Sequence, residues 1–142
     1  MRAVSDDHGF SGQHAREPRL FRSEDAGQTW TALAVGLATS CPAVEVPRIA
    51  QIVFDPRDPA LVWVGVEIDG VWRSEDGGKT FAKHVRGLDT EDIHGLAVTY
   101  QDGQRWVFAV TNRGLFASLD AGLTSTPRPF DCTSPSIRRS RI

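Results

Sequence analysis

Ser74-Glu75-Asp76-Gly77-Gly78-Lys79-Thr80-Phe81 is the stretch that decides the fold, because its pattern occurs three times in the chain. Upstream the chain reads Ser23-Glu24-Asp25-Ala26-Gly27-Gln28-Thr29-Trp30, and downstream it reads Ser118-Leu119-Asp120-Ala121-Gly122-Leu123-Thr124-Ser125. The serines of this Ser-x-Asp-x-Gly-x-Thr pattern lie 51 and then 44 residues apart. A period of this length is typical of stacked or radially repeated architectures, in which one repeat cannot bury its apolar face alone.

Length and composition are those of an ordinary globular domain. The chain has 142 residues, of which 40% are hydrophobic and 24% charged, and its net charge is -2. Because there is no basic excess, a nucleic-acid partner is not expected. No apolar run approaches the roughly 20 residues of a membrane span, and residues 1–8 lack the apolar core of a secretory signal. We therefore expect no membrane association, and a cytoplasmic location if the chain is complete.

The cysteines and histidines do not predict a metal centre. Cys41 and Cys132 have no spacing that suggests a zinc site or a disulfide framework, so we expect free thiols. His8, His14 and His84 likewise lack the spacing of metal ligands. No metal and no other cofactor is predicted.

Short apolar and β-branched runs precede each copy of the pattern. Before the second and third copies these runs are 48–54, 61–66 and 71–73, and 93–100, 105–110 and 115–117, while 20–22 precedes the first. The linkers 55–59 and 101–104 are rich in turn-forming residues. Together with a last strand that begins at the threonine and aromatic residue of the pattern, each repeat is predicted to hold four short antiparallel strands.

Four antiparallel strands in about 45 residues are typical of a β-propeller blade. We therefore predict an all-β chain, 1–142, that forms an incomplete propeller. Its segments are an incomplete first blade (1–40) that is irregular before Arg19, a second blade (41–86), a third blade (87–131), and the beginning of a next blade (132–142). A closed propeller has typically four to eight blades, so we expect a fragment of about three. Its open ends would be covered by the remaining blades of a longer parent chain or by self-association.

The three copies of the pattern resemble Asp-boxes, also called bacterial neuraminidase (BNR) repeats. The resemblance covers roughly residues 19–126. It implies a β-propeller of the sialidase-like and sortilin-like superfamily, whose members share the blade and not the chemistry. The resemblance therefore predicts the fold and leaves the activity open.

A structural role is expected for the repeated pattern itself. A short acidic side chain two residues after a serine can accept hydrogen bonds from the backbone of its own turn, and glycine supplies the positive φ that the turn requires. The structural residues are Ser23, Asp25, Gly27, Thr29, Trp30, Ser74, Asp76, Gly78, Thr80, Phe81, Ser118, Asp120, Gly122 and Thr124. Because Ser125 replaces the aromatic residue, the third turn is expected to be the least anchored.

A functional site is expected at the opposite ends of the strands. There the sequence places the strand entry Arg48 and the two connecting loops 67–69 and 111–113. The candidate binding residues are Arg48, Glu67, Asp69, Asn112 and Arg113. Glu91, Asp92 and His94 are candidates for acid-base chemistry, although a solvated loop and a packed histidine are the commoner roles of such residues.

Glycoside hydrolysis is the most specific functional hypothesis, with Glu91 or Asp92 as acid or base and arginines binding an acidic sugar. In sialidases an Arg-Ile-Pro signature precedes the first box, whereas Arg48-Ile49-Ala50 follows one and lacks the proline. Tyr100, the single tyrosine, is expected at the end of its strand that faces the repeated turns. No complete catalytic set is therefore assigned.

The leading prediction is a non-catalytic or cryptic scaffold that binds a ligand such as a glycan. One alternative is a fragment of a BNR-repeat glycoside hydrolase, exo-sialidase-like, whose catalytic residues lie largely in missing blades. Another is a propeller that docks proteins during assembly. The expected partner is accordingly a glycan or a protein, and whether the chain is an enzyme stays open.

Overall fold

The chain folds into three antiparallel β-sheets. The structure is a computed structural model, and it describes residues 2–4, 18–39 and 47–128. Within these ranges there are eleven strands and no helix. In each sheet the strands lie side by side in chain order, so that neighbouring strands are also consecutive in the sequence. The all-β prediction is confirmed.

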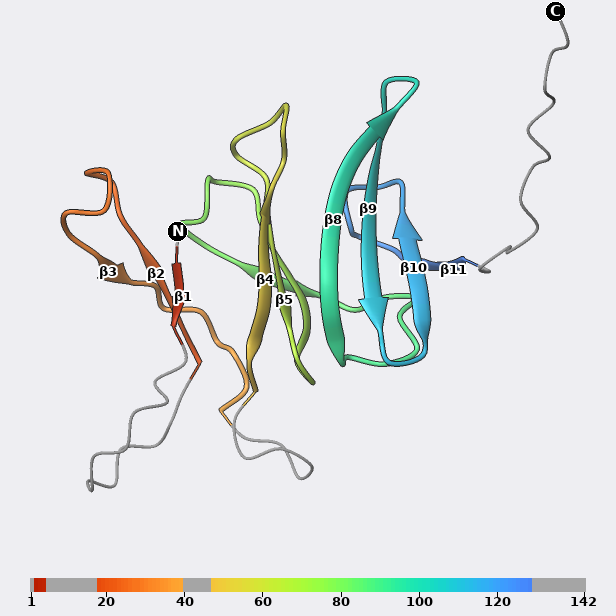
Figure 1. Ribbon diagram of the computed structural model, residues 1–142, viewed down its shortest axis with the longest axis horizontal. Helices are drawn as coiled ribbons and strands as arrows, with labels where there is room; N and C mark the ends of the chain where they lie inside the picture. The colour runs from red at the N-terminus through yellow and green to blue at the C-terminus, as the bar shows by residue number, and fades with distance from the viewer. Residues whose placement is uncertain (1, 5–17, 40–46, 129–142) are drawn as a thin grey trace, which may run out of the picture.

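The sheets follow one another along the chain. The first consists of β1 (Arg2–Val4), β2 (Arg19–Arg22) and β3 (Thr31–Ala32). The second consists of β4 (Ile49–Phe54), β5 (Val62–Val66), β6 (Gly70–Ser74) and β7 (Ala82–His84). The third consists of β8 (Ile93–Gln101), β9 (Gln104–Thr111), β10 (Gly114–Ser118) and β11 (Thr126–Arg128). Figure 1 shows the three sheets next to one another in this order.

The strands predicted from apolar runs are present, with two differences at the periphery. The last strand of each sheet begins two residues after the threonine at which it was expected, at Thr31, Ala82 and Thr126. The reason is that the threonine of the pattern is held inside the turn by the aspartate. In addition β1, which lies in a segment predicted to be irregular, pairs with β2. Cys41, Cys132 and the segment 132–142 lie outside the described residues.

The sheets pack face to face, and the second sheet is apolar on both of its faces. We call the face of a sheet that points toward the next sheet in the chain its forward face, and the opposite one its backward face. On the backward face of the second sheet, Val64, Val66 and Trp72 pack against Leu20 of the first sheet. All residues of β5 and β6 are consequently buried.

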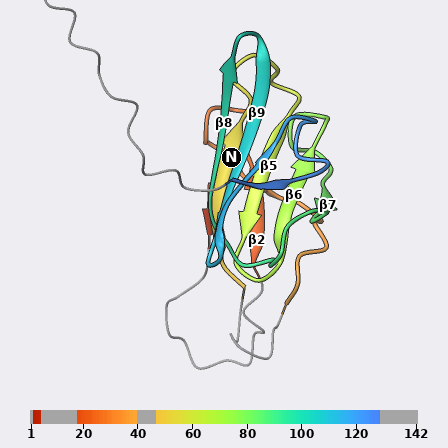
Figure 2. The ribbon, with the colours of Figure 1, turned by 90° about the vertical axis from the view of Figure 1, so that its right-hand side faces the viewer.

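The forward face of the second sheet meets the third sheet. Here Trp63 and Val71 pack against Ile93, Leu96 and Phe116. Figure 2, which looks along the stack from the side of the third sheet, shows the sheets lying behind one another. A Cβ atom on Gly65 would lie 2.8 Å from Cγ2 of Ile93, so that glycine lets the third sheet approach closely. Two apolar contacts of the same kind therefore join three sheets.

The third repeated turn is anchored by the neighbouring sheet. The indole Nε1 of Trp63 donates a hydrogen bond of 3.1 Å to the carbonyl oxygen of Ala121. The amide of Ser125 also donates to the carbonyl oxygen of Arg86, at 2.9 Å. The expectation that this turn is the least anchored is therefore wrong, because the missing aromatic residue is replaced by contacts from outside its own sheet.

Replacing Trp63 with phenylalanine should destabilise the protein by about 1 to 3 kcal/mol. The change removes a hydrogen bond between the second sheet and the third turn and leaves space in a fully buried position. The matched change Trp30→Phe removes a similar bond, to the carbonyl oxygen of Gly27, but at a side chain that is 42% exposed. We expect its cost to stay within about 0.5 kcal/mol. Urea unfolding of both variants tests this, and equal costs would contradict the anchoring role of Trp63.

Candidate functional site

The repeated turns are built around their aspartates. In the first, Asp25 accepts hydrogen bonds from the Ser23 hydroxyl at 2.8 Å and from the Thr29 amide and hydroxyl at 2.8 and 2.6 Å. Asp76 and Asp120 accept the same bonds from the serine and threonine of their own turns. Each serine oxygen in turn accepts the amide of the glycine four residues later. The three carboxylates are thus occupied within their turns.

These hydrogen bonds stabilise the charged form of the aspartates. Bonds from Thr29 and then from Ser23 lower the pKa of Asp25 to about 2. Burial acts to raise the pKa of Asp120, but the bonds from Ser118 and Thr124 outweigh it and lower the pKa to about 2. The pKa of Asp76 is lowered by the same kind of bonds, with Thr80 contributing most. A carboxylate held in this way is a poor proton donor or acceptor near neutral pH.

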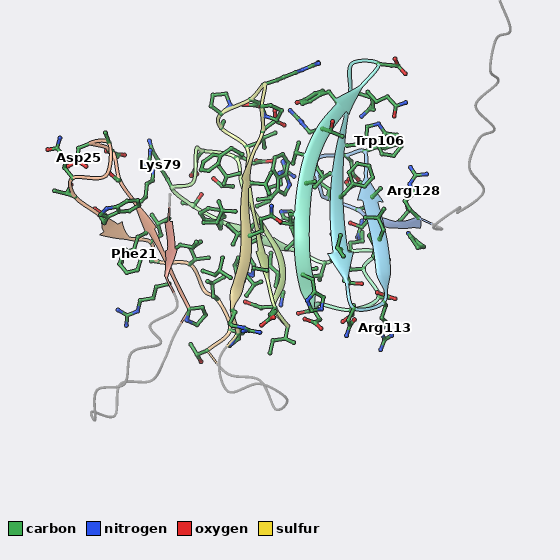
Figure 3. The ribbon with its side chains drawn as sticks, in the orientation of Figure 1. Phe21, Asp25, Lys79, Trp106, Arg113 and Arg128 are labelled. Atoms are coloured by element: carbon green, nitrogen blue, oxygen red, sulfur yellow. The ribbon has the colours of Figure 1, made fainter. Side chains whose placement is uncertain are left out.

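The repeated turns lie at one end of the sheets and the candidate binding residues at the other. Figure 3 shows Asp25 and Lys79 at the upper end and Arg113 at the lower end. We call these the turn end and the loop end. Strands β6 and β10 each run from a hairpin to a repeated turn. The hairpins that precede them, β5–β6 and β9–β10, therefore lie at the loop end.

Arg48 and Glu67 form an exposed ion pair at the loop end. The guanidinium group donates from Nε and Nη2 to the two carboxylate oxygens, at 2.7 and 2.9 Å. The backbone supports the pair, because the Glu67 amide donates to the carbonyl oxygen of Arg48 at 2.8 Å. The Arg48 side chain is nevertheless 68% exposed. The pair therefore presents mainly its guanidinium group to solvent, because the Glu67 side chain is only 18% exposed.

Asp69 has a structural role that the sequence did not indicate. Its buried carboxylate accepts hydrogen bonds from the Ala38 amide, the Trp72 indole and the Lys83 ammonium group, at 2.8, 3.2 and 2.8 Å. It thereby ties the segment after the first sheet to β6 and β7. Its oxygens are thus occupied by structural hydrogen bonds, while its assignment as a binding residue stays a prediction.

Lys83 extends this cluster to the third sheet. Its ammonium group also donates to Glu91 at 2.6 Å. Burial acts to lower the pKa of Lys83, but the hydrogen bonds to Asp69 and Glu91 outweigh it and raise the pKa. The backbone joins the same segments, because the Gly70 amide donates to the carbonyl oxygen of Glu91 at 2.8 Å. Glu91 is therefore an ion-pair partner that holds a loop.

The remaining candidates surround this cluster. The Oδ2 atom of Asp92 lies 3.3 Å from Nε2 of His94. The Arg113 amide donates to the Thr111 hydroxyl at 3.1 Å, which shapes the hairpin between β9 and β10. Asn112 and Arg113 are exposed. The structure thus brings together Arg48 with Glu67 and Asp92 with His94, and leaves Asn112 and Arg113 on a separate hairpin of the same end.

A polar network at the turn end was missed by the sequence analysis. Buried Asp55 accepts hydrogen bonds from the amides of Arg57 and Asp58 and from the Tyr100 hydroxyl, and it pairs with Arg105 at 2.6 Å. Burial acts to raise the pKa of Asp55, but these bonds, those from Arg57 and Tyr100 first, lower it. The network joins the second and third sheets. The turn signal in 55–59 was visible in the sequence, whereas its partners 45 to 50 residues away were not.

No family model matches the chain, and no curated protein matches it.

In the described ranges, no group of three or more His, Cys, Asp and Glu side chains is arranged to hold a metal ion. A search of the same ranges finds no helix that is long and apolar enough to cross a membrane.

The stability of the protein should decrease as the pH falls from about 4 to about 2. Aspartates have a pKa near 3.9 in unfolded chains, whereas the pKa of Asp120 is about 2 in the folded protein. Its contribution is therefore present above pH 4 and is lost as the pH falls toward the folded value. In Asp120→Asn the difference between the urea midpoints at pH 5 and pH 2.5 should be smaller than in the wild type. Asp89→Asn, in an exposed loop, is the control, and the idea fails if both variants behave alike.

Proposed function

We propose that the chain is a non-catalytic β-propeller scaffold of the Asp-box class that binds a polar ligand, of the glycan type, at its loop end. The observation that carries the proposal is the contrast between the two ends of the sheets. At the turn end, Asp25, Asp76 and Asp120 are occupied by their own turns. At the loop end, exposed charged and amide side chains come from both the second and the third sheet. A ligand at the loop end can therefore meet side chains from two sheets.

The propeller part of the proposal is supported by the repeated geometry. Each sheet is an antiparallel meander, its last strand but one leads into a repeated turn, and the sheets stack on one another in chain order. The first strands of successive sheets, β1 with β4 and β4 with β8, also lie in contact. Blades that radiate from a common axis have this arrangement, because their first strands lie nearest the axis.

The ligand part is supported by the kind of groups at the loop end. Exposed Arg48 and Arg113 offer donors, and Asn112 offers both donors and acceptors, whereas the two oxygens of Glu67 already accept from Arg48. Sugar hydroxyls are donors and acceptors at once, so a mixed set of this kind can hydrogen-bond them without leaving a group unpaired. An acidic sugar would in addition find the guanidinium groups of Arg48 and Arg113.

A binding role fits these residues better than hydrolysis. Glycoside hydrolysis needs two carboxyl groups that flank one bond, one of them able to deliver a proton. Glu91 is held by Lys83, and Asp92 lies beside His94. Tyr100 lies at the turn end, bonded to Asp55 and Arg105. The two candidate carboxylates thus each lie beside a basic side chain, and the single tyrosine lies at the opposite end of the sheets.

Binding to a glycan array, followed by titration with the best glycan, tests the proposal. We expect Arg48→Ala and Asn112→Ala to weaken binding by about tenfold each, which corresponds to the loss of about one hydrogen bond. Lys79→Ala, an exposed cation at the turn end, is the matched control and should bind as the wild type does. The absence of any glycan ligand, or an effect of Lys79→Ala alone, would sink the proposal.

A hydrolysis assay on the same glycans separates binding from catalysis. We expect no turnover by the wild type. Turnover that is lost in Asp92→Asn would replace the proposed scaffold with a glycoside hydrolase.

A further inference from the structure

The stack has two outer faces: the forward face of the third sheet and the backward face of the first. The strand register shows which residues on these faces are equivalent to residues on the buried faces of the second sheet. Trp63 pairs with Arg73, the residue before Ser74, and Phe108 pairs with Ala117, the residue before Ser118. Phe108 is therefore the equivalent of Trp63, and by the same register Val110 is the equivalent of Gly65 and Leu115 that of Val71. In the second sheet this forward face is covered by the third sheet. In the third sheet no described strand lies beyond it.

The open forward face of the third sheet is apolar. The rings of Trp106 and Phe108 stack with their centroids 5.9 Å apart, and the Arg128 guanidinium lies 4.7 Å above Trp106. Val110 is 43% exposed, whereas its equivalent Gly65 is buried. Figure 3 shows Trp106 and Arg128 on the outer side of this sheet. Apolar side chains gathered on one sheet face are typical of an interaction surface.

The backward face of the first sheet is the other open face of the stack, and it is equivalent to the backward face of the second sheet. Phe21 is the residue before Arg22-Ser23, as Trp72 is before Arg73-Ser74, and Trp72 packs against the preceding sheet. Trp30 corresponds in the same way to Phe81, which also packs there, yet Trp30 is 42% exposed. Figure 3 shows Phe21 on the outer side of the first sheet. Both outer faces of the chain therefore carry apolar side chains at positions that are buried in its two internal contacts.

We propose that a second copy of this chain covers these faces head to tail, with the third sheet of each copy packed on the first sheet of the other. Two such contacts close a ring of six sheets, which lies within the four to eight blades of closed propellers. Rings with two-fold symmetry are the commonest closed assemblies, and a head-to-tail contact closes only if its rotation fits. The contact rests on the observed stacking, while the ring rests on the propeller architecture proposed above.

The mass of the 142-residue chain in solution tests the contact. Light scattering after size-exclusion chromatography should give about twice the 15.6 kDa of one chain over a roughly hundredfold range of concentration. Val110→Asp and Trp30→Asp should each weaken the dimer by at least about a hundredfold, because each buries an unpaired carboxylate. The third turn carries Ser125 at the position of Trp30, so a small polar residue is compatible with the turn. Circular dichroism verifies that both variants are folded.

A mixture of the two variants tests the head-to-tail arrangement. Each variant keeps one intact face, so that mixing two monomeric variants should restore a dimer through one contact. The matched control is Leu123→Asp, an aliphatic side chain that is 45% exposed at the turn end, where the second repeat carries Lys79. It should leave the mass unchanged. A monomeric wild type, or a Trp30→Asp variant that stays dimeric, would overturn the proposal.

The outcome is separable from that of the proposed function. A dimer that binds no glycan supports the interface and sinks only the glycan proposal. A monomer that binds a glycan supports the glycan proposal and sinks only the interface.

Discussion

Burial of the second sheet on both of its faces is the constraint on which the rest of the structure depends. Trp63 points to one side of this sheet and Trp72 to the other, and both are buried. Side chains of this size can be removed from water on both sides only when a further sheet lies against each face. The approach must also be close, which Gly65 permits. The stack of sheets follows from the composition of β5 and β6, in which no position is left for a solvated side chain.

This constraint divides the polar residues into two groups. Those at the turn end are used for structure: the aspartates of the repeated turns hold their own backbones, and Asp55 joins two sheets. A turn that satisfies its own hydrogen bonds can be repeated once per sheet without help from its surroundings. At the loop end the polar residues differ from sheet to sheet, as expected of positions that are not required for folding. Asp69 with its partners Lys83 and Glu91 is an exception, because the buried Asp69 carboxylate accepts bonds from three separate segments and Lys83 links it to Glu91.

The sequence predicted whatever is repeated or local. The strands from β4 to β6 and from β8 to β10 follow from apolar runs between turn residues, and the roles of Asp25, Asp76 and Asp120 follow from their spacing to serine and threonine. What it could not predict are contacts between distant residues. The bond from Trp63 to Ala121 and that from Tyr100 to Asp55 span 58 and 45 residues. The alternation of apolar and polar residues predicts on which face of a strand a side chain lies, but not which polar group of another sheet it contacts.

Distant contacts of this kind also decide how firmly the candidate site is held. The third sheet is bound to the second at both ends: Trp63 reaches the third turn at the turn end, and near the loop end the amide of Leu96 donates to Oε1 of Gln51 at 2.8 Å. The Gly70 amide and the Lys83 ammonium group add two bonds to Glu91. Because these bonds lie at opposite ends of the same interface, they resist both sliding and tilting of one sheet against the other. Residues of the loop end that belong to different sheets, such as Arg48 and Arg113, are therefore held at a fixed separation, although neither is bonded to the other.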